Sequence, residues 1–128
     1  MPRHYKVLLV DDDADLLVEL ADSLEAAGYK VETFSDGEEA LEAAGRLVPD
    51  IALVDLKMKG KSGFQVAEEI RRIEPVADIP IVAMTGYYTR PEDEKLMKKC
   101  GIEACLYKPF SAETAARRLN SILRSRKM

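Results

Sequence analysis

Short apolar runs alternate with longer amphipathic stretches along almost the whole chain. Four of these runs are continuously apolar, which is typical of strands that are buried on both faces of a parallel sheet. A fifth run, at residues 31–34, is weaker and more polar. The pattern predicts strands at residues 7–10, 31–34, 51–54, 79–84 and 104–107.

The stretches that follow these runs carry apolar residues at spacings of three and four, the period of a helix that buries one side. One such stripe follows each run, so five helices are predicted. The stripes are Leu16, Leu17, Leu20, Leu24 and Ala27, then Ala40, Leu41 and Ala44, then Ala67, Ile70 and Ile73, then Leu96, Met97 and Cys100, and last Ala115, Leu119, Ile122 and Leu123.

Capping signals mark several boundaries of these helices. Asp36, Ser62 and Thr89 each precede a helical stripe and are answered three positions later by Glu or Gln, the pattern of a capping box. We therefore expect helices to begin after these three residues. Glycine often ends a helix because it adopts a left-handed conformation without strain, and the predicted ends are Gly28, Gly45 and Gly101.

Strict alternation of strand and helix predicts an α/β fold that forms a three-layer sandwich. Each strand reaches its parallel neighbour through a right-handed crossover, which places a helix on one face of the sheet. In such folds, ligands bind beyond the carboxyl ends of the strands. The residues at the strand ends are therefore the candidates for function.

Composition narrows the classes of function. A chain of 128 residues that is 47% hydrophobic can bury its own core, so we expect one domain over residues 1–128. The net charge is -4, and its 23 acidic and 19 basic residues are interspersed, which argues against direct binding of nucleic acid. No apolar run approaches the roughly 20 residues that span a bilayer, and no signal peptide is evident, so we expect a cytoplasmic protein without membrane insertion.

The cysteines and the histidine form no catalytic or metal-binding pattern. Cys100 and Cys105 lie in apolar stretches without a Cys-x-x-Cys or Cys/His arrangement, so we expect buried free thiols. His4, the only histidine, precedes the first strand and is expected at the surface. A function that depends on histidine chemistry in this chain is therefore not expected.

Polar residues stand at the ends of four predicted strands. Asp11 and Asp12 follow the first strand, Asp55 follows the third, Thr85 the fourth and Lys108 the fifth. Carboxylates brought within about 5 Å of one another repel by roughly 3 kcal/mol per pair at an effective dielectric near 20, so a cation is needed among them. Mg²⁺ is the expected metal because it prefers hard oxygen ligands, and the Lys108 ammonium adds a second positive charge.

Carboxylates, a dication, a hydroxyl and an ammonium are the groups that phosphoryl transfer needs, because positioning and charge neutralisation provide most of its catalysis. One carboxylate can attack phosphorus while the others hold the metal. The residue types alone leave open which aspartate is the nucleophile.

Four motifs occur in one order along the chain: VLLVDDD at residues 7–13, PD at 49–50 followed by VDL at 54–56, MTG at 84–86 and YKPF at 107–110. Together they resemble the receiver domains of response regulators in two-component signal transduction, including the chemotaxis receivers. The resemblance covers residues 5–125. It implies a flavodoxin-like fold, with five parallel strands in the order 2-1-3-4-5 and five helices.

The resemblance implies that the chain is a phosphoacceptor switch in a phosphorelay and not an enzyme acting on other substrates. Asp55 would accept a phosphoryl group from a phosphohistidine on a sensor histidine kinase or a histidine phosphotransfer protein. The domain would catalyse only its own phosphorylation and dephosphorylation. The surface of the fourth helix, fifth strand and fifth helix would then bind a downstream target protein or domain, or a second copy in a homodimer.

The resemblance also assigns roles around Asp55. Thr85 would donate a hydrogen bond to one phosphoryl oxygen and Lys108 would pair with another. The Lys108-Pro109 peptide bond is expected to be cis, a form that proline permits at low cost. The implied Mg²⁺ ligands are Asp12 and Asp55 directly, Asp11 through water, and Lys57 through its backbone carbonyl.

The chain departs from the family pattern at three places. Cys105 stands where family members usually carry Tyr or Phe, the residue that links the phosphorylation site to the output surface, so the usual coupling is not expected here unless Tyr107, Tyr87 or Tyr88 takes over that role. The loop at residues 57–63 carries three lysines and lacks the usual Pro after Met58. No output domain follows residue 126, so the chain is either a stand-alone regulator or an excerpt of a longer protein.

Two other classes of protein share part of this pattern. Asp11 and Asp13 resemble the start of an aspartate-nucleophile phosphatase of the haloacid dehalogenase kind, in which Asp11 would be the nucleophile. Asp15 stands where that motif has Thr or Val, and the chain has no room for a cap domain. A flavodoxin-like FMN-binding protein is disfavoured because the first loop carries carboxylates where a phosphate needs hydroxyls and amides.

Overall fold

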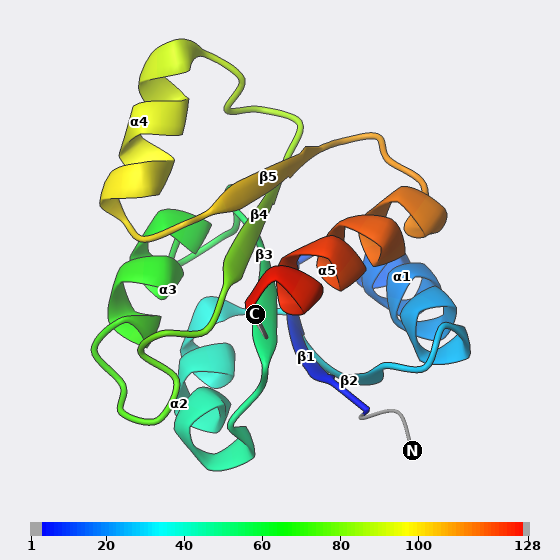
Figure 1. Ribbon diagram of the computed structural model, residues 1–128. Coiled ribbons are helices and arrows are strands. Elements are labelled where there is room, and N and C mark those ends of the chain that lie inside the picture. Colours follow the sequence, from blue (N-terminus) through cyan, green and yellow to red (C-terminus); the bar gives the residue numbers. More distant parts are fainter. Residues whose placement is uncertain (1–3, 127–128) are drawn as a thin grey trace.

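A computed structural model describes residues 4–126 (Figure 1). Strands and helices alternate in the predicted order. The strands are β1 (Lys6–Val10), β2 (Lys30–Phe34), β3 (Ile51–Asp55), β4 (Ile81–Thr85) and β5 (Ala104–Tyr107). The helices are α1 (Ala14–Ala26), α2 (Gly37–Leu47), α3 (Gly63–Ile70), α4 (Pro91–Lys99) and α5 (Ala112–Arg126).

The five strands form one parallel sheet in the order β2-β1-β3-β4-β5, which confirms the expected topology. Helices α1 and α5 cover one face of the sheet, and α2, α3 and α4 cover the other (Figure 1). Val10 is paired with Val54 across β1 and β3, so the residues that follow these two positions emerge together at the carboxyl edge of the sheet.

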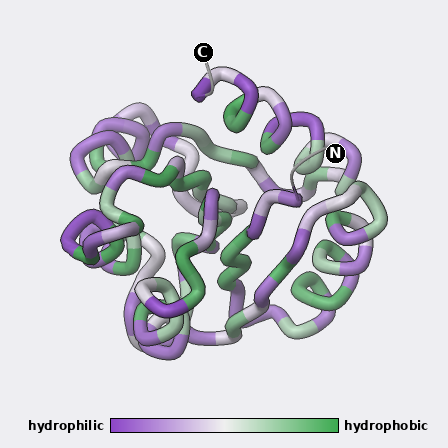
Figure 2. The backbone as a smooth tube through the Cα atoms, turned by 60° about the horizontal axis from the view of Figure 1, so that its bottom comes forward, coloured by the Kyte–Doolittle hydropathy of each residue, from purple (hydrophilic) through white to green (hydrophobic). Residues whose placement is uncertain are grey.

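Burial explains the hydrophobic pattern of the strands. The central strands β1, β3 and β4 are covered by helices on both faces, and their apolar side chains are at most 1% exposed. Two hydrophobic clusters, one on each face, share these strands. The tube in Figure 2 is accordingly hydrophobic along the inner strands, whereas hydrophobic and hydrophilic segments alternate along the outer helices. Strand β2 lies at the edge of the sheet, which accounts for its weaker and more polar run.

One of the three predicted capping boxes is confirmed in full, because the side chains of Ser62 and Gln65 each accept the other's backbone N–H. Asp36 is the cap residue of α2 as predicted, and its carboxylate accepts the backbone N–H of Glu39. The prediction for Thr89 was wrong, because α4 begins one residue later. Arg90 is its cap residue, and the Asp93 carboxylate accepts the Arg90 backbone N–H at 3.0 Å.

Three predicted boundaries also differ from the structure. Strand β4 begins at Ile81 and not at Ile79, because Pro80 has no N–H to donate to the ladder. Helix α3 ends at Ile70, so Ile73 packs against the core from the following turn. Helix α2 continues past Gly45 to Leu47. A Cβ atom at Gly45 would lie 3.3 Å from the Ile73 side chain, so this glycine serves close packing and not helix termination.

Glycines end α1 and α4 as predicted. Gly28 and Gly101 both adopt positive φ angles just beyond these helices.

The Lys108-Pro109 peptide bond is cis, which confirms that expectation. No helix within residues 4–126 is long and apolar enough to cross a membrane.

Helix α2 ends with a strained residue, since Val48 has a φ angle of 49° in the left-handed region. A β-branched residue is poorly suited to this conformation, which costs roughly 1–2 kcal/mol for residues other than glycine and asparagine. The Val48 side chain is 45% exposed, so little packing offsets the strain.

We therefore expect Val48→Asn to raise the free energy of unfolding by about 1 kcal/mol, because asparagine adopts the left-handed conformation more readily. Urea unfolding followed by circular dichroism measures the change. Val18→Asn is the matched control, since Val18 is exposed on α1 in a helical conformation and its replacement should not stabilise the protein. A Val48→Asn variant no more stable than the natural chain would show that Val48 carries no strain.

Candidate functional site

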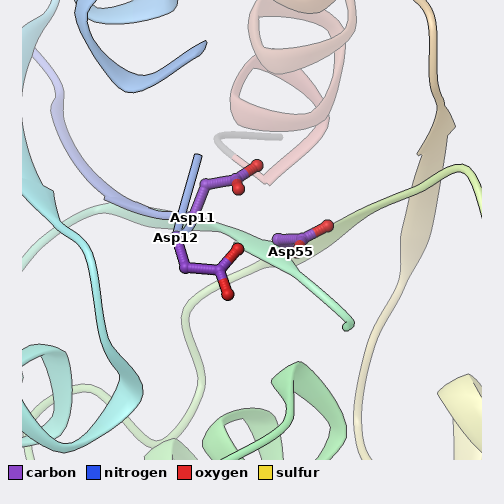
Figure 3. A group of neighbouring side chains, drawn as sticks. All are labelled: Asp11, Asp12 and Asp55. Carbon is purple, nitrogen blue, oxygen red and sulfur yellow. The ribbon is translucent and has the colours of Figure 1, made fainter. Parts of the chain in front are cut away.

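Three carboxylates meet at the carboxyl edge of the sheet. Asp11 and Asp12 directly follow β1, and Asp55 is the last residue of the neighbouring strand β3. The three carboxylates offer oxygen atoms that all lie within 4.8 Å of one another (Figure 3). Asp11 and Asp55 are buried, whereas Asp12 is exposed to solvent. The cluster therefore has one open side.

Lys108 provides the positive charge closest to this cluster. Its Nζ atom lies 2.8 Å from Oδ2 of Asp11 and 3.2 Å from Oδ1 of Asp55. The Lys108 backbone N–H donates to the Thr85 carbonyl at 2.8 Å, which fixes the chain beyond β5 beside the end of β4. Burial alone would lower the pKa of Lys108, but its hydrogen bond to Asp11 and the charges of Asp11 and Asp55 raise that pKa above its ordinary value.

Asp55 has an unusually high affinity for a proton. Burial, and after it the charge of the neighbouring Asp11, raise its pKa from 3.8 to about 6, against the opposing charge and hydrogen bond of Lys108. Lys108 therefore only partly neutralises the site. An additional cation on the open side would favour the ionised form of Asp55.

The arrangement of donors and acceptors suits a hard dication. Carboxylate oxygens from three residues converge, and Mg²⁺ prefers such ligands together with carbonyl oxygens and water. The Asp12 carboxylate also accepts the Lys59 backbone N–H at 3.1 Å, which ties the loop after β3 to the cluster. The three carboxylates of this cluster thus fit a magnesium site.

Thr85 ends β4 at the same edge of the sheet and is 1% exposed. Its Oγ1 atom accepts the backbone N–H groups of Tyr87 at 3.0 Å and Tyr88 at 2.9 Å. A hydroxyl has two acceptor lone pairs and one donor hydrogen, so these bonds occupy its acceptor capacity. The hydroxyl hydrogen is left to donate to an anion bound at the edge of the sheet.

The loop between β3 and α3 is held at several points. Gly63 packs so closely that a Cβ atom there would lie 2.2 Å from the Asp55 carbonyl oxygen, which excludes any larger residue. The Lys61 ammonium pairs with Glu38 at 3.1 Å and with Glu69 at 2.7 Å, and so bridges α2 and α3. These contacts fix the loop that carries Lys57, the predicted backbone ligand of the metal.

The Lys57 side chain reaches across the edge of the sheet to Tyr87. Its Nζ atom lies 3.7 Å from the centroid of the Tyr87 ring. The Tyr87 ring packs edge-on against Tyr88, and Tyr88 packs edge-on against Phe64 at the start of α3. No pattern in the sequence indicates the contact of Lys57 with Tyr87, or that of Tyr88 with Phe64, because both depend on how the loops after β3 and β4 meet.

The remaining candidates lie away from the carboxylates. Cys105 on β5 is a free thiol as expected but is only half-buried, so the expectation of a buried thiol was wrong there, and burial raises the pKa of this thiol to about 11. Cys100 is a buried free thiol, as expected. His4 is exposed and its ring lies 3.0 Å from the Gly28 carbonyl oxygen, which agrees with the expected surface position.

Comparison with known sequences points to one family. The model of the response regulator receiver domain matches residues 7–120. The transcriptional regulatory protein RprY of Bacteroides fragilis is 36% identical over 124 residues, which cover 97% of this chain and 51% of RprY. The DNA-binding dual master transcriptional regulator RpaA of Synechocystis is 34% identical over 97% of this chain and 50% of RpaA. The chain thus spans about half the length of these curated relatives.

Solved structures agree with this similarity. The chemotaxis protein CheY4 of Vibrio cholerae superposes with a TM-score of 0.90 and 33% identity, over 94% of this chain and 99% of CheY4. The receiver domain of the sensor histidine kinase PA1611 from Pseudomonas aeruginosa has a TM-score of 0.85 and 27% identity, over 94% of this chain and 98% of that domain. The PA1611 structure has a magnesium ion coordinated in its active site cleft.

The raised pKa of Asp55 gives a test of the charge balance. In the absence of metal, the folded protein holds the Asp55 proton up to about pH 6, whereas the unfolded chain releases it near 3.8. Ionised Asp55 therefore destabilises the fold increasingly as the pH rises from about 4 to about 6, and the full penalty, about 3 kcal/mol, applies above that range.

We expect Asp55→Asn, measured by urea unfolding in EDTA, to stabilise the protein by up to about 3 kcal/mol at pH 7.5 and by about 1 kcal/mol near pH 4.5. Added Mg²⁺ should reduce the difference at pH 7.5. Asp22→Asn on the exposed side of α1 is the control and should change little. A less stable Asp55→Asn variant at pH 7.5 would contradict this charge balance.

Proposed function

Because the chain belongs to the response regulator receiver domain family, we propose that it is a phosphorylation switch in which Asp55 is the phosphoacceptor and residues 1–128 act as one receiver domain. The observation that carries this proposal is the position of Asp55, whose carboxylate lies 3.2 Å from the Lys108 ammonium beside the Asp11 and Asp12 carboxylates. A phosphoryl group on Asp55 would meet a fixed cation, a metal site and the Thr85 hydroxyl.

The proposed reaction transfers a phosphoryl group from a phosphohistidine. An oxygen of the ionised Asp55 carboxylate attacks phosphorus, the phosphorus–nitrogen bond of the donor breaks, and the leaving imidazole nitrogen keeps the bonding electron pair and takes a proton from solvent. Lys108 then pairs with one phosphoryl oxygen and Thr85 donates its hydroxyl hydrogen to another. In hydrolysis, water attacks the same phosphorus and releases phosphate, which restores the carboxylate.

The metal site assists this transfer through charge. Asp12 and Asp55 would bind Mg²⁺ directly, Asp11 through water, and Lys57 through its backbone carbonyl. When bound there, Mg²⁺ would supply positive charge toward the phosphoryl oxygens, and in phosphoryl transfer such charge neutralisation provides most of the catalysis together with positioning. Asp11 itself is a poor nucleophile, because its carboxylate binds both the Lys108 ammonium and the Asp13 backbone N–H. This argues for Asp55 over the phosphatase interpretation.

The same contacts can drive a change of state. Charge-assisted hydrogen bonds contribute about 1.5–3 kcal/mol each, so Thr85 and Lys108 together would supply about 3–6 kcal/mol if their phosphoryl contacts form in one state only. A shift from 1:99 to 99:1 requires about 5.5 kcal/mol. Phosphorylation can therefore convert most of the population.

The coupling to the rest of the domain would run through the loop between β4 and α4. Cys105 replaces the usual aromatic residue, but Thr85 is bonded to the backbone of Tyr87 and Tyr88, and the Tyr88 side chain packs against the core on the α4 side of the sheet. A movement of Thr85 toward the phosphoryl group would therefore pull this loop and the start of α4.

The partners are a sensor histidine kinase or histidine phosphotransfer protein upstream, and a downstream target protein or domain. We assign target binding, or pairing with a second copy, to the surface formed by α4, β5 and α5. Leu96 and Tyr107 are exposed on this surface. Cys105 and Met97 line a hollow of about 210 Å³ beside them, which a partner's side chain could fill. The net charge of -4 argues against direct contact of this domain with nucleic acid.

The primary test measures covalent modification of the chain. With acetyl phosphate and Mg²⁺, mass spectrometry should detect one added phosphoryl group on the natural chain and none on Asp55→Asn. Asp12→Ala should react much more slowly, because the metal is bound less tightly. Modification that persists in Asp55→Asn and disappears in Asp11→Asn would instead favour the phosphatase interpretation.

The contact of Lys57 with Tyr87 leads to an expectation about the lifetime of phospho-Asp55. Hydrolysis needs a water in line with the breaking bond, and these two side chains stand beside that approach. Neither the lysine nor the tyrosine is well suited at neutral pH to accept a hydrogen bond from this water and orient it. Because each tenfold change in rate corresponds to about 1.4 kcal/mol of barrier, displacement of one positioned water can lengthen the lifetime by one or two orders of magnitude.

We expect Lys57→Asn combined with Tyr87→Glu to shorten the lifetime of phospho-Asp55 at least severalfold while Mg²⁺ affinity changes little. The decay is followed by phosphate release after removal of the donor, and Mg²⁺ affinity is measured separately by titration. Lys59→Asn, an exposed lysine of the same loop, is the control. An equal or longer lifetime in the double variant would show that these side chains do not restrict the water.

A further inference from the structure

The loop between β3 and α3, residues 56–62, carries the proposed backbone ligand of the metal and has no regular secondary structure of its own. Its first half is anchored by burial, because Leu56 and Met58 both lie in the hydrophobic cluster that α2, α3 and α4 cover. Lys57 stands between these two residues and is exposed. Burial therefore explains the position of residues 56–58 but not that of residues 59–61.

The second half of the loop has little packing. Lys59 and Gly60 are exposed, and Gly60 turns the chain with a φ angle of 77°. A Cβ atom at Gly60 would have no neighbour within 4 Å, so the turn lies open to solvent. The Lys59 backbone N–H nevertheless donates to the Asp12 carboxylate at 3.1 Å, which places this turn beside the metal site. Another contact must keep the turn in that position.

Lys61 supplies this contact. Its ammonium lies 3.1 Å from the Glu38 carboxylate in the first turn of α2 and 2.7 Å from the Glu69 carboxylate in α3. The Lys61 side chain is 26% exposed, less than either carboxylate side chain, so the bridge is partly shielded from solvent. The hydrogen bonds to Glu69 and Glu38 raise the pKa of Lys61, so this side chain stays charged at neutral pH.

The stem of Lys61 is held as well as its ammonium. A Cβ atom at Gly37, the first residue of α2, would lie 3.1 Å from Cβ of Lys61 and 2.7 Å from the Val66 side chain. The start of α2 thus rests directly on the loop and on α3. The loop cannot shift at Lys61 without disturbing its contacts with α2 and α3.

We propose that Lys61 is a positioning residue for the metal site, because it clamps the turn at residues 59–61 to α2 and α3 and so places the Lys57 carbonyl before the metal binds. This inference rests on the proposed function, in which that carbonyl is a metal ligand. A loop that is already ordered loses less conformational entropy when the metal binds. The bridge from Lys61 to Glu38 and Glu69 therefore raises the affinity for Mg²⁺.

Removal of the Lys61 ammonium distinguishes this role from simple electrostatics. A positive charge in the loop beside three carboxylates repels Mg²⁺, so its loss alone would strengthen metal binding. Loss of the bridge would instead weaken metal binding, because the turn is then free to move away from the site. The two effects have opposite signs, so the direction of the change shows which one dominates.

The test is a calorimetric titration with Mg²⁺ in about 0.15 M KCl, where salt screens charges more than about 8 Å apart. Lys61→Met keeps most of the aliphatic stem and removes the ammonium. Loss of a group that orients a metal ligand typically weakens metal binding by about 10- to 100-fold, and Lys61 acts on its ligand only through the chain, so we expect a loss of about fivefold. Lys61→Arg keeps a charge that can reach both carboxylates and should retain the affinity of the parent.

Lys59→Met is the matched control, since it removes the same charge from the same loop. The Lys59 side chain is exposed and takes part in none of the ion pairs found within residues 4–126. The variant keeps the backbone N–H that donates to Asp12. It should bind Mg²⁺ as tightly as the parent or slightly more tightly. Urea unfolding verifies that each variant is folded.

Two further measurements report on the position of the loop. In EDTA, the Lys59 amide should exchange with solvent at least severalfold faster in Lys61→Met than in the parent, because its bond to Asp12 is then broken more often. With acetyl phosphate, Lys61→Met should react more slowly at low Mg²⁺ and reach the rate of the parent once Mg²⁺ is saturating. A change in overall stability alone would not produce this dependence on Mg²⁺.

Three results would overturn the proposal. Lys61→Met could bind Mg²⁺ at least as tightly as the parent, which would show that the charge of Lys61 matters more than its bridge. Lys61→Arg could bind as weakly as Lys61→Met, which would show that the ion pairs are not responsible. Lys59→Met could lose as much affinity as Lys61→Met, which would make the effect one of charge in the loop.

Failure of the proposed function itself would look different. A parent chain that binds no Mg²⁺ would contradict the metal site, and the role of Lys61 would be overturned with it. A parent chain that binds Mg²⁺ and does not respond to Lys61→Met would contradict the role of Lys61 alone.

Discussion

The Lys108 ammonium between the Asp11 and Asp55 carboxylates is the interaction on which the site depends. Two carboxylates about 5 Å apart repel by roughly 3 kcal/mol at an effective dielectric near 20, whereas a lysine about 3 Å from each attracts each by roughly 5 kcal/mol. This attraction holds both acids at the edge of the sheet while they are buried. Without it, the pair would be unfavourable wherever both are ionised.

Lys108 neutralises the three carboxylates only in part, and the remaining negative charge determines what the site can bind. One lysine faces three carboxylates, and the pKa of Asp55 stays near 6 because burial and Asp11 outweigh Lys108. The site therefore favours a further cation on its open side. If Asp55 is the phosphoacceptor, as proposed, the Lys108 ammonium already lies 3.2 Å from its carboxylate, so this cation would need little reorganisation during transfer.

Charge is also distributed unevenly on the outside of the molecule. The domain carries a net charge of -4 with residues of both signs interspersed along the chain, but the charged residues of α1 are all acidic, whereas α5 carries four arginines and one glutamate. The sheet separates this pair of helices from the face covered by α2, α3 and α4.

The sequence alone determined the element order and the composition of the site. Continuous apolar runs reveal buried parallel strands because both faces of each are covered, and parallel strands bring their carboxyl ends to one edge, so Asp11, Asp55 and Lys108 could be grouped before any contact was known. Local sequence signals for helix ends and caps were less reliable where a contact in the folded structure competes with them. Gly45 resembles a helix end but supplies space for Ile73, and Thr89 resembles a cap although Asp93 bonds Arg90.

Only the tertiary structure decided how the loops and helices meet. The contact of Lys57 with Tyr87 and the bridge of Lys61 to Glu38 and Glu69 join segments whose relative placement no local pattern encodes. The position of α1 beside α5 likewise depends on strand order, because the first and last helices become neighbours only when the sheet places their crossovers on one face. Periodicity reports which side of an element is buried, whereas the partner of each exposed side chain is set by the packing of the whole chain.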